Sequence, residues 1–515
     1  MMIEITINNK QYSFEKGTSL LKAIESTGVN VPSLCYYEGI EHFTSCMLCL
    51  VKDAHSGRLF PSCSHQVAEG MEIITDDEEI FDARKTGLEL LLSEHAGDCE
   101  APCTLACPAN MNIPLMNRLL EKGEMDHALA VVRKDIALPS VLGRICPAPC
   151  EGACKRKPVD EAVSVCLLKR YAGDYGTVTL PAKPIQQDKK VAVIGAGPAG
   201  LAAAYYLQME GIPCDVFDKN KLPGGNLQYA INDELLPKDV LNREIQYIRD
   251  TGVQFFQNTG IDQEQFDKLS REYQAVVLAT GDYYEEIGQW GIDNNNKQVQ
   301  IDKSTFQTNH KHVFAVGNVT RSSRLAIRSL GQGKDAARSV LQFLNGEPVS
   351  GKRKKFNSKL GKLIEDEFSE YLKEATDFKR FTPKKGIQNG FSLREMVNEA
   401  SRCMHCDCRK IDHCKLRDFS DDYDAKQKRF DYSERKSLKK YIQEEVVLYE
   451  PGKCIKCGIC VRLTARYKEQ YGLTFIGRGF DVEVQVPFNK DLKTGLAKTA
   501  GIVAEACPTG ALSKM

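Results

Sequence analysis

The sequence predicts a multidomain chain of mixed α/β and α+β class, and three observations support this prediction. Apolar and polar residues alternate near the start of the chain, as they do in a half-buried β-strand. Further along, a short apolar run leads into a glycine-rich loop and an alanine-rich helix, the order found in nucleotide-binding α/β units. Nineteen of the twenty cysteines fall into spacings that suit iron–sulfur clusters.

Residues 1–80 are predicted to form the first domain. Alternation over residues 3–7 predicts a strand, and a turn at residues 8–10 leads into a second strand. Thr18 is the predicted N-cap of the following helix and Gly28 its end. This order, followed by Cys-x10-Cys-x2-Cys-x13-Cys, resembles the β-grasp [2Fe–2S] ferredoxin of the largest iron–sulfur subunit of complex I, of [FeFe]-hydrogenases and of NAD-linked formate dehydrogenases. The implied ligands are Cys35, Cys46, Cys49 and Cys63.

Residues 81–185 are predicted to form a helical domain with two [4Fe–4S] clusters. His95-x3-Cys99 follows an apolar helix and resembles the complex I subunit, where a histidine is a cluster ligand. The spacing from Cys103 to Cys154 resembles the N-terminal domain of the glutamate synthase small subunit, shared with dihydropyrimidine dehydrogenase and NADH-dependent ferredoxin:NADP⁺ oxidoreductase. The resemblance implies one cluster held by His95, Cys99, Cys103 and Cys154. It implies another held by Cys107, Cys146, Cys150 and Cys166.

Some of these ligands have an alternative interpretation. The first Cys-x2-Cys of the resembled family is missing, so His95 is inferred as a ligand from its position and from the ligand count. The alternative is an exposed or capping histidine. The alternative for Cys166 is a buried structural thiol, because relatives often carry another residue there. Zinc is the alternative for every set. The ten-residue gap after Cys35 and the Cys507-Pro508 ending favour clusters over paired zinc hooks.

Residues 186–346 are predicted to form an FAD-binding Rossmann-like domain. The strand 191–194 leads into a G-x-G-x-x-G loop, whose glycines let the backbone approach a pyrophosphate at a helix N-terminus. Asp218, about twenty residues on, is predicted to bind the ribose hydroxyls. Segments 276–281 and 313–318 resemble the two later flavin strands of the family, with Asn318 replacing the usual aspartate. The predicted cofactor-binding residues are Gly195, Gly197, Pro198, Ala199, Gly200, Asp218, Gly224, Gly225, Gly281, Gly317 and Asn318. The alternative, a retained fold without flavin, conflicts with Asp218 and the intact glycines.

This domain lacks the NAD(P)H-binding insertion of the family that it resembles. Those proteins carry a whole NAD(P)H domain between the two later strands, whereas only residues 282–312 lie there in this chain. A single βαβ unit already takes about 30 residues or more, and no second glycine fingerprint occurs. We therefore predict a loop with a short strand in this segment, and a flavin without its own nicotinamide site.

The last third predicts two further cluster sites. Residues 347–440 predict a surface helix near 363–372, a linker and a [4Fe–4S] segment, with His405 and His413 as neighbours rather than ligands. Residues 441–515 resemble complex I-type and formate dehydrogenase ferredoxin modules. Thr464 stands where a second cluster would need a cysteine, so we predict one [4Fe–4S] cluster there. The predicted ligands are Cys403, Cys406, Cys408 and Cys414 for the first site, and Cys454, Cys457, Cys460 and Cys507 for the second.

The composition argues against a nucleic-acid-binding, membrane-spanning or secreted protein. Charged residues make up 27% of the chain and their signs balance to a net charge of zero, so no global field favours nucleic acid or membrane. No apolar run reaches the roughly 18 residues of a transmembrane helix, and the first residues show no secretory signal. Many cysteines in a large intracellular chain argue for metal binding over disulfides. We expect a cytoplasmic protein.

These observations predict an electron-transfer subunit of a larger oxidoreductase, carrying one [2Fe–2S] cluster, four [4Fe–4S] clusters and FAD. The resemblances imply partners such as a complex I-like NADH/FMN subunit, a hydrogenase, a formate dehydrogenase, a bifurcating transhydrogenase or ferredoxin. Two alternatives are an NAD(P)H-dependent reductase of the glutamate synthase small-subunit type and a cluster-stabilised scaffold. No catalytic acid–base or nucleophile pair is recognisable. The oxygen sensitivity of exposed clusters predicts an anaerobic setting.

Overall fold

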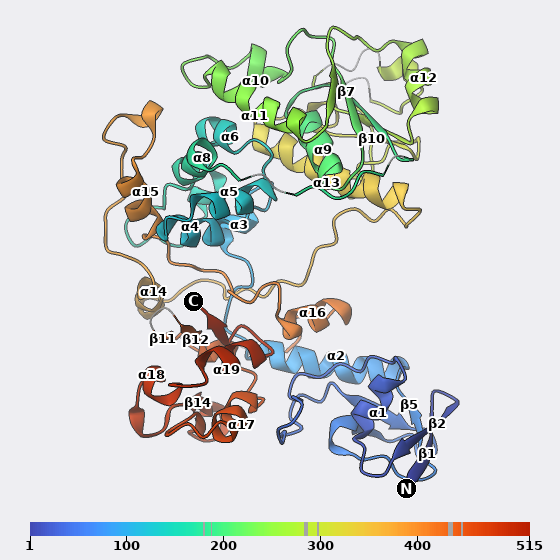
Figure 1. Cartoon of the computed structure of the whole chain (residues 1–515), viewed down its shortest axis with the longest axis vertical. Helices are drawn as coiled ribbons and strands as arrows, with labels where there is room; N and C mark the ends of the chain where they lie inside the picture. Colours follow the sequence, from blue (N-terminus) through green and yellow to red (C-terminus); the bar gives the residue numbers. More distant parts are fainter. Residues whose placement is uncertain (179–180, 187, 283–286, 296–297, 431–435, 444–445) are drawn as a thin grey trace. The chain divides into compact units, whose positions relative to one another are not determined.

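The computed structural model describes every residue except 179–180, 187, 283–286, 296–297, 431–435 and 444–445 (Figure 1). The chain divides into two compact units. Unit 1 comprises Met1–Glu100, Lys355–Lys373 and Asp407–Met515, and unit 2 comprises Ala101–Lys354 and Glu374–Cys406. Two segments of unit 2 are therefore inserted into the sequence of unit 1. The chain changes unit between Cys99 and Cys103 and again between Cys406 and Cys408.

Unit 1 begins with a five-stranded mixed sheet in the order β2-β1-β5-β3-β4. Its strands are β1 (Met2–Ile7), β2 (Lys10–Glu15), β3 (Leu50–Asp53), β4 (Leu59–Pro61) and β5 (Glu72–Ile74). The alternating isoleucines of β1 are buried with the apolar face of α1 (Leu20–Ser26), as the period of two requires. The helix begins one residue later than predicted, with Ser19 at the N-cap, because the Thr18 hydroxyl donates to the Glu15 carbonyl instead.

Helix α2 (Glu78–Ser93) carries the chain from this sheet to His95 and Cys99. Asp77 caps the helix by accepting a hydrogen bond from the Ile80 amide at 2.8 Å. Arg84 is 4% exposed and donates to the carbonyls of Leu50 and Thr75. The helix is thus tied to the sheet at its start, so the position of its far end is defined within unit 1.

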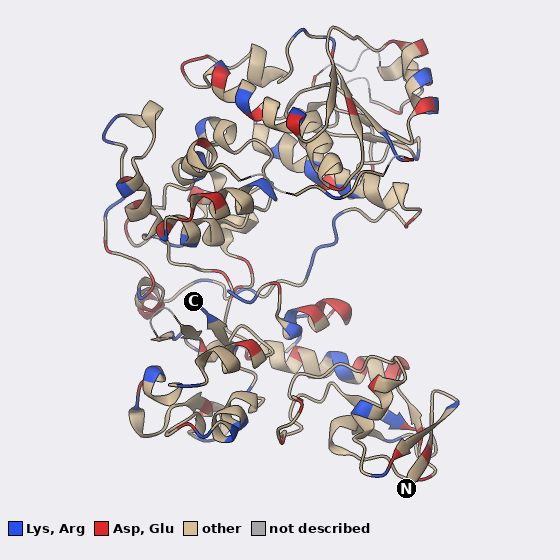
Figure 2. Ribbon diagram, viewed as in Figure 1, with Lys and Arg blue, Asp and Glu red and all other residues tan. Residues whose placement is uncertain are grey.

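The segment predicted as a solvated linker is partly buried. Lys355–Lys373 belongs to unit 1 and contains α14 (Glu365–Leu372), where Glu367 is 1% exposed and accepts a hydrogen bond from the Leu438 amide at 3.0 Å. Ser358 is also buried. The predicted surface helix is thus present as α14, and most charged residues of the stretch are exposed, while buried positions such as Glu367 and Ser358 pack the stretch into unit 1. The basic run 352–355 stands just before it (Figure 2).

The C-terminal part of unit 1 is a small α+β module. It contains a three-stranded antiparallel sheet in the order β11-β12-β15 and a hairpin of β13 and β14. The strands are β11 (Tyr441–Gln443), β12 (Val447–Tyr449), β13 (Thr474–Ile476), β14 (Glu483–Gln485) and β15 (Leu512–Lys514). The helices of this part are α16 (Lys415–Asp422), α17 (Ile459–Arg466), α18 (Leu492–Gly495) and α19 (Ala500–Ala506). Cys460 lies in the first turn of α17 and Cys507 follows the last residue of α19, so both helices position thiols of this module.

Within its described residues, unit 2 begins with six short helices, four of which carry a cysteine within or next to them. They are α3 (Pro102–Ala106), α4 (Ile113–Glu121), α5 (Met125–Arg133), α6 (Pro139–Ile145), α7 (Pro149–Gly152) and α8 (Val165–Tyr175). Proline stands in the first turn of four of them, where its missing N–H costs nothing. Helix α15 (Leu393–Ala400), far along the chain, packs against α4 and α8. The last segment of unit 2 thus completes the helical part.

The remainder of unit 2 is a parallel sheet covered by helices. Its strands are β6 (Val191–Ile194), β7 (Cys214–Phe217), β8 (Gln254–Phe256), β9 (Ala275–Leu278) and β10 (Val313–Ala315), in the order β10-β9-β6-β7-β8. The helices are α9 (Pro198–Met209), α10 (Asn226–Tyr229), α11 (Lys238–Asp250), α12 (Gln263–Glu272) and α13 (Ala326–Leu344). The central strand β6 is fully buried and is followed directly by Gly195, as in doubly wound nucleotide-binding folds.

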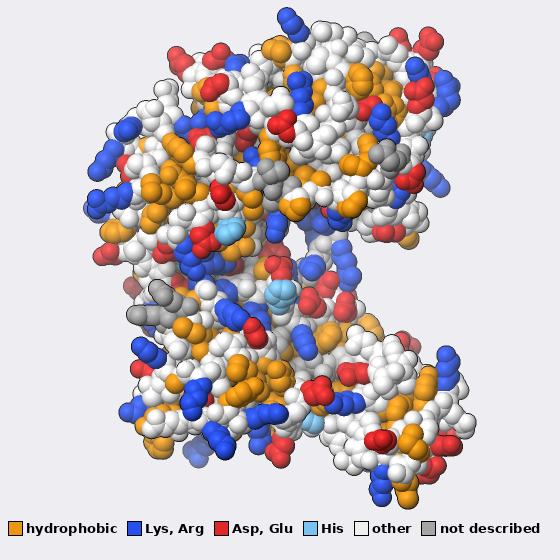
Figure 3. Space-filling view, in the orientation of Figure 1, with side chains coloured by type: hydrophobic (Ala, Val, Ile, Leu, Met, Phe, Trp, Pro, Cys, Tyr) orange, Lys and Arg blue, Asp and Glu red, His pale blue; other side chains and the backbone are white. Residues whose placement is uncertain are grey.

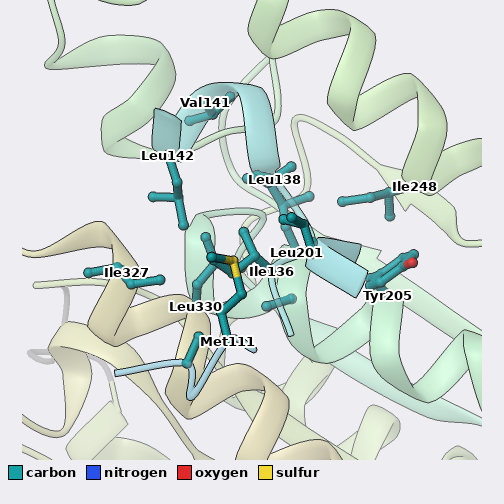
Figure 4. Close-up of a cluster of buried hydrophobic side chains, with 14 of the residues drawn as sticks. Met111, Ile136, Leu138, Val141, Leu142, Leu201, Tyr205, Ile248, Ile327 and Leu330 are labelled. Atoms are coloured by element: carbon teal, nitrogen blue, oxygen red, sulfur yellow. The ribbon is translucent and has the colours of Figure 1, made fainter. Parts of the chain in front are cut away.

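The helical part and the parallel sheet share one hydrophobic core (Figure 4). Figure 4 shows Val141 and Leu142 of α6 with Leu201 and Tyr205 of α9, and Leu330 of α13 beside them. Burial of large side chains contributes about 1.5–3 kcal/mol each, so this continuous core holds the two parts together as one compact unit. The confirmed fold class thus combines a mixed N-terminal sheet, a helical region, a parallel Rossmann-type sheet and a C-terminal ferredoxin-like module.

The segment between β9 and β10 is short. Residues 283–286 and 296–297, which the sequence prediction included, lie outside the described residues. Its described residues form the 3₁₀ turn η2 (Ile287–Trp290) and two isolated bridges, Asn294 with Val299 and Gln307 with Phe314. No strand–helix–strand unit occurs among those described positions.

Charges of both signs are interspersed on the visible surface, and hydrophobic side chains appear there in scattered groups (Figure 3). Within the described ranges, no helix is long and apolar enough to cross a membrane.

Candidate functional site

The four cysteines of the N-terminal thiol set (Cys35, Cys46, Cys49, Cys63) lie close together. The sulfur atoms of Cys35 and Cys46 are 3.4 Å apart. Side-chain hydrogen bonds join Cys63 to Cys35 and to Cys49. All four predicted [2Fe–2S] ligands are therefore brought together, and all four are buried.

The C-terminal thiol set (Cys454, Cys457, Cys460, Cys507) lines a single cavity. Lys456 has a left-handed φ of +55°, and the backbone turn there lets both thiols of the Cys-x2-Cys run face the cavity. Cys460 lies in the first turn of α17 and Cys507 at the end of α19. Thr464 is buried and accepts a hydrogen bond from the Leu473 amide, so it has a structural partner.

The helical thiol set (Cys107, Cys146, Cys150, Cys166) is assembled by four helices of unit 2. Cys107 and Cys146 cap the ends of α3 and α6, and Cys150 and Cys166 lie in the first turns of α7 and α8. Cys166 forms side-chain hydrogen bonds with both Cys146 and Cys150. Cys166, for which a structural thiol was the alternative, therefore lies among the other three.

A buried lysine faces the helical thiol set. Lys169 follows Cys166 by one turn of α8, is 3% exposed, and has its Nζ atom 3.8 Å from the Cys166 sulfur. Burial by itself lowers the pKa of Lys169, but the neighbouring thiolates outweigh it and raise this pKa above its usual value. A buried charge needs a partner. An ammonium beside four thiols fits a cluster whose thiolate ligands carry net negative charge.

The other seven cysteines outside β7 are divided between the two units. Cys99 lies with Cys408 and Cys414 in unit 1, since the Cys408 amide donates to the Cys99 carbonyl at 3.0 Å. Burial and the thiolates of Cys408 and Cys99 raise the pKa of Cys414 to about 12. The Ser358 amide donates to the Cys99 sulfur at 3.4 Å. Of the predicted set of Cys403, Cys406, Cys408 and Cys414, the last two thus lie in unit 1 with Cys99, and the first two belong to unit 2.

His95 lies close to this unit 1 group. Its side chain is half-buried, and its Nδ1 atom is buried without a hydrogen-bond partner. Burial and the nearby Lys453 ammonium lower the pKa of His95 to about 3. Lys453 also acts on Cys408, and it pairs with Glu450 in a salt bridge that is almost fully buried. An orphaned imidazole nitrogen at this position fits a cluster ligand better than a helix cap.

Cys103, Cys154, Cys403 and Cys406 lie in unit 2. Burial and the neighbouring Cys403 thiolate raise the pKa of Cys154. Cys403 also forms side-chain hydrogen bonds with His405 and Asn117. His405 is a neighbour of these thiols, with its Nε2 atom 3.6 Å from a Glu121 carboxylate oxygen.

Within unit 1 the thiol groups are adjacent to one another. The Cys35 thiolate of the N-terminal set contributes to the raised pKa of Cys457 in the C-terminal set. The Cys507 thiolate of the C-terminal set contributes in the same way to Cys414. Cys35, Cys46, Cys414 and Cys457 also share one hydrophobic core. Three successive thiol groups therefore follow one another through the interior of unit 1.

The Rossmann-type part holds a cleft of about 540 Å³ at the carboxyl end of its parallel strands. Nine of the eleven predicted cofactor-binding residues line it: Gly195, Gly197, Pro198, Ala199, Asp218, Gly225, Gly281, Gly317 and Asn318. Gly200 and Gly224 do not line the cleft but contact the glycine loop that does. A Cβ atom at Gly200 would lie 1.9 Å from the Gly195 carbonyl, and the Gly224 amide donates to Ala196 at 2.8 Å. The glycines thus keep open a cradle that larger side chains would fill, as a dinucleotide requires.

Two predicted polar contacts to the cofactor are already engaged. The Asp218 carboxylate accepts hydrogen bonds from the amides of Ala196 and Asn220, at 2.7 and 2.8 Å. Asp218 thus braces the glycine loop, and its remaining lone pairs are available for ribose hydroxyls. The Asn318 amide donates to the Asp282 carboxylate at 3.0 Å, and its oxygen accepts from the Ser323 amide at 3.1 Å.

Sequence reasoning missed several groups that surround the sites. Lys169 could have been found from its position three residues after a ligand on the same helix. Ser358 and the Lys453–Glu450 pair carry no motif signal. Cys214, the cysteine left outside every set, is buried in β7, and burial raises its pKa. Among the described residues, no three His, Cys, Asp or Glu side chains converge closely enough to hold a single metal ion.

Four family models match successive parts of the chain. Residues 1–78 match the 2Fe-2S iron–sulfur cluster binding domain, and residues 92–179 match dihydropyrimidine dehydrogenase domain II with its 4Fe-4S clusters. Residues 193–267 match the NAD(P)-binding Rossmann-like domain, and residues 444–513 the ferredoxin-like domain of NADH-quinone oxidoreductase subunit 3. The chain thus combines two iron–sulfur ferredoxin-type domains, a helical 4Fe-4S domain and a dinucleotide-binding domain, as the resemblances implied.

Curated relatives cover part of the chain. The NADPH-Fe(3+) oxidoreductase subunit beta of Geobacter sulfurreducens is 36% identical over 230 residues, which is 42% of this chain and 34% of the relative. The NADP(+)-dependent formate dehydrogenase subunit beta of Moorella thermoacetica is 38% identical over 208 residues, covering 35% and 29%. The glutamate synthase [NADPH] small chain of Bacillus subtilis is 37% identical over 185 residues, covering 35% and 37%. The matches thus span only about a third of each relative.

Proposed function

We propose that this chain is an iron–sulfur flavoprotein electron-transfer subunit of a cytoplasmic multisubunit oxidoreductase. It would carry one [2Fe–2S] cluster, four [4Fe–4S] clusters and FAD in the five-part division predicted from the sequence. The observation that carries the proposal is the succession of adjacent thiol groups in unit 1. Cys35 is close enough to Cys457 to raise its pKa, Cys507 does the same to Cys414, and Cys35, Cys414 and Cys457 share one hydrophobic core. Electron transfer slows steeply with distance, so adjacent cofactors form a relay, whereas zinc sites or a scaffold need no such succession.

The flavin site supports the same function. The cofactors would supply one-electron steps at the clusters and one- or two-electron steps at the flavin. The chain's own residues hold them: the glycine loop after β6 receives the pyrophosphate, and Lys169 offsets the charge of the helical set. Helix α13 lines the flavin cleft at Ala326 and Ser329, and a Cβ at its Gly331 would lie 2.6 Å from the Pro108 carbonyl. The cleft and the helical set, which includes Cys107, are therefore neighbours.

The partners are proposed by class. The relatives named above are subunits of formate dehydrogenase and of an NADPH-Fe(3+) oxidoreductase. We propose that this chain likewise assembles with a complex I-like NADH/FMN subunit, a hydrogenase, a formate dehydrogenase or a transhydrogenase, or that it exchanges electrons with ferredoxin.

A second candidate is a self-contained NAD(P)H-dependent reductase. It is favoured by the identity to the NADPH-linked glutamate synthase small chain. The short segment between β9 and β10 opposes it, since its described residues form only a 3₁₀ turn and isolated bridges.

An anaerobic titration separates the two candidates. The purified holoprotein receives NADH, then NADPH, then dithionite, while flavin and cluster absorbance is followed. We expect bleaching by dithionite alone. Prompt bleaching by either nucleotide would make the reductase the better function, and a Gly200→Val variant, which loses the dinucleotide cradle, would show whether that reduction passes through the flavin.

A further inference from the structure

We propose that the run Cys403–Cys414 is divided between two clusters: Cys403 and Cys406 complete one with Cys103 and Cys154, while Cys408 and Cys414 complete another with Cys99 and His95. The inference deepens the proposed function and rests on it, because it assigns ligands to clusters that the relay would contain. Neither the spacing of the cysteines nor the matching family domains assigns these groups.

Two buried arginines bring Cys403 beside Cys154. Arg156 and Arg402 are 2% and 0% exposed, and they stand two residues and one residue from these cysteines. Both guanidinium groups bind the Asp160 carboxylate, at 2.8 and 3.1 Å. Arg156 also donates to the Arg402 carbonyl at 2.6 Å. The segment that carries Cys403 is therefore locked onto the loop that follows Cys154.

A buried glutamate extends this lock. Glu399 pairs with the Arg402 guanidinium at 2.9 Å and accepts a hydrogen bond from the Ser164 amide at 2.7 Å. Its other oxygen accepts from the Phe381 amide at 2.8 Å. Every charge in the network has a partner, as buried ionic groups require. The docking of residues 374–406 on the helical part is thus specific rather than a loose linker contact.

The backbone between Cys403 and Cys406 turns both thiols toward one site. His405 has a left-handed φ of +43° at the second position between the cysteines. Lys456 has a φ of +55° at the same position between Cys454 and Cys457, whose thiols line one cavity. The shared turn indicates that Cys403 and Cys406 also serve one cluster.

Cys103 lies on the same side of the helical part. It belongs to α3, which packs against α7, and α7 ends two residues before Cys154. Cys103, Cys154 and Cys403 are all packed in or against one hydrophobic core. Cys403 in turn reaches Asn117 of α4, the helix that follows α3. Three thiols from three distant segments are thus packed together within unit 2, and Cys406 stands one turn of backbone from Cys403.

Cys408 and Cys414 belong to a different environment. Cys414 lies in the hydrophobic core of unit 1, whereas Cys403 lies in that of unit 2. Cys408 is joined to Cys99 through the backbone, and a Cβ at Gly510 would lie 2.2 Å from its sulfur. The buried Nδ1 atom of His95, which has no partner, supplies the fourth ligand of this group.

Paired alanine variants of the holoprotein test the division, with iron analysis and EPR of the dithionite-reduced protein as readouts. If the run is divided, Cys403→Ala with Cys408→Ala loses two clusters, and Cys154→Ala with Cys403→Ala loses one. If the run is a single site, the first pair loses one cluster and the second pair loses two. Cys214→Ala, which removes a buried thiol outside every set, should lose none.

Serine variants keep an oxygen ligand and cover the case in which alanine variants fail to fold. Cys406→Ser and Cys103→Ser should alter one and the same EPR signal, and Cys408→Ser and Cys99→Ser should alter another. A common signal for Cys406→Ser and Cys408→Ser would overturn the division. The wild-type iron content tests the proposed function separately: wild-type protein without clusters would refute the relay, whereas full iron with the opposite pairing would refute only the division.

Discussion

Replacing Lys169 with methionine should lower the reduction potential of the cluster that we propose for the helical thiol set. Methionine keeps the length and the apolar stem of the lysine but removes its charge. Lys169 is 3% exposed, so water does not screen that charge effectively. The ammonium stabilises the more negative, reduced form of the cluster, and its loss should favour the oxidised form.

The magnitude follows from the distance of 3.8 Å between the Lys169 Nζ atom and the Cys166 sulfur. The added electron spreads over the whole cluster, so we take an effective separation of about 6 Å, which gives about 3 kcal/mol at an effective dielectric constant of 20. For a one-electron couple this free energy corresponds to a shift of about 120 mV. Residual screening by water at the site would reduce the shift to no less than about 60 mV.

The assay is an EPR-monitored redox titration of the holoprotein. Lys169→Arg retains the charge and should shift the potential by less than about 30 mV. Lys134→Met removes an exposed charge of the same unit and should leave the potential within about 20 mV, because exposed charges are screened. An unchanged or raised potential in Lys169→Met, with normal iron content, would refute the electrostatic reasoning.

Three further predictions concern stability and cofactor binding. Burial raises the pKa of Glu244 to about 7, above its ordinary value, although the amides of Ser140 and Val141 donate to it. Its stabilising contribution is thus full below about pH 4.5 and is lost by about pH 7, so the melting temperature should fall between about pH 4.5 and about pH 7 and level off above it, and Glu244→Gln should lose that slope. An equal slope in both proteins would contradict this. Arg402→Met leaves the buried Glu399 carboxylate without its guanidinium partner and should lower the free energy of unfolding by about 3–5 kcal/mol in denaturant titrations, a loss under about 1 kcal/mol being the contrary result. Gly195→Ala would bring a Cβ to 2.3 Å from the Ala279 carbonyl at a φ of +110°, so the purified variant should retain little FAD by absorbance, and wild-type flavin content would speak against the cleft assignment.

The fold classes and the local thiol runs could be predicted from the sequence because their signals are short-range. Cys454-x2-Cys457-x2-Cys460 needs only one turn of backbone to bring its thiols together, and the glycine loop after β6 needs only a strand and a helix. Cys146 and Cys166, which the resemblance assigned to one set, also lie beside each other in the fold although they come from different helices.

The grouping of the remaining thiols could not be predicted from spacing. Whether Cys403 lies beside Cys154 or beside Cys408 depends on tertiary contacts, here the buried arginines Arg156 and Arg402. These are ordinary residues in the sequence, and their role appears only when segments more than 200 residues apart are packed together. The buried position of Glu367 was missed for the same reason. A charged run predicts a solvated face, and the Leu438 amide that donates to Glu367 lies far away in the sequence.

The insertion of unit 2 into unit 1 has a consequence for how the protein is made. Cys99 leaves the ribosome about 300 residues before Cys408, its neighbour in the finished structure. At about 5–20 residues per second, the thiol waits about 15–60 s before its site can form. The first sheet and its four cysteines can fold and receive iron during that interval. Biogenesis is therefore expected to proceed in two stages. The Cys99 thiol must stay reduced until Cys408 has been synthesised, when the chain is nearly complete.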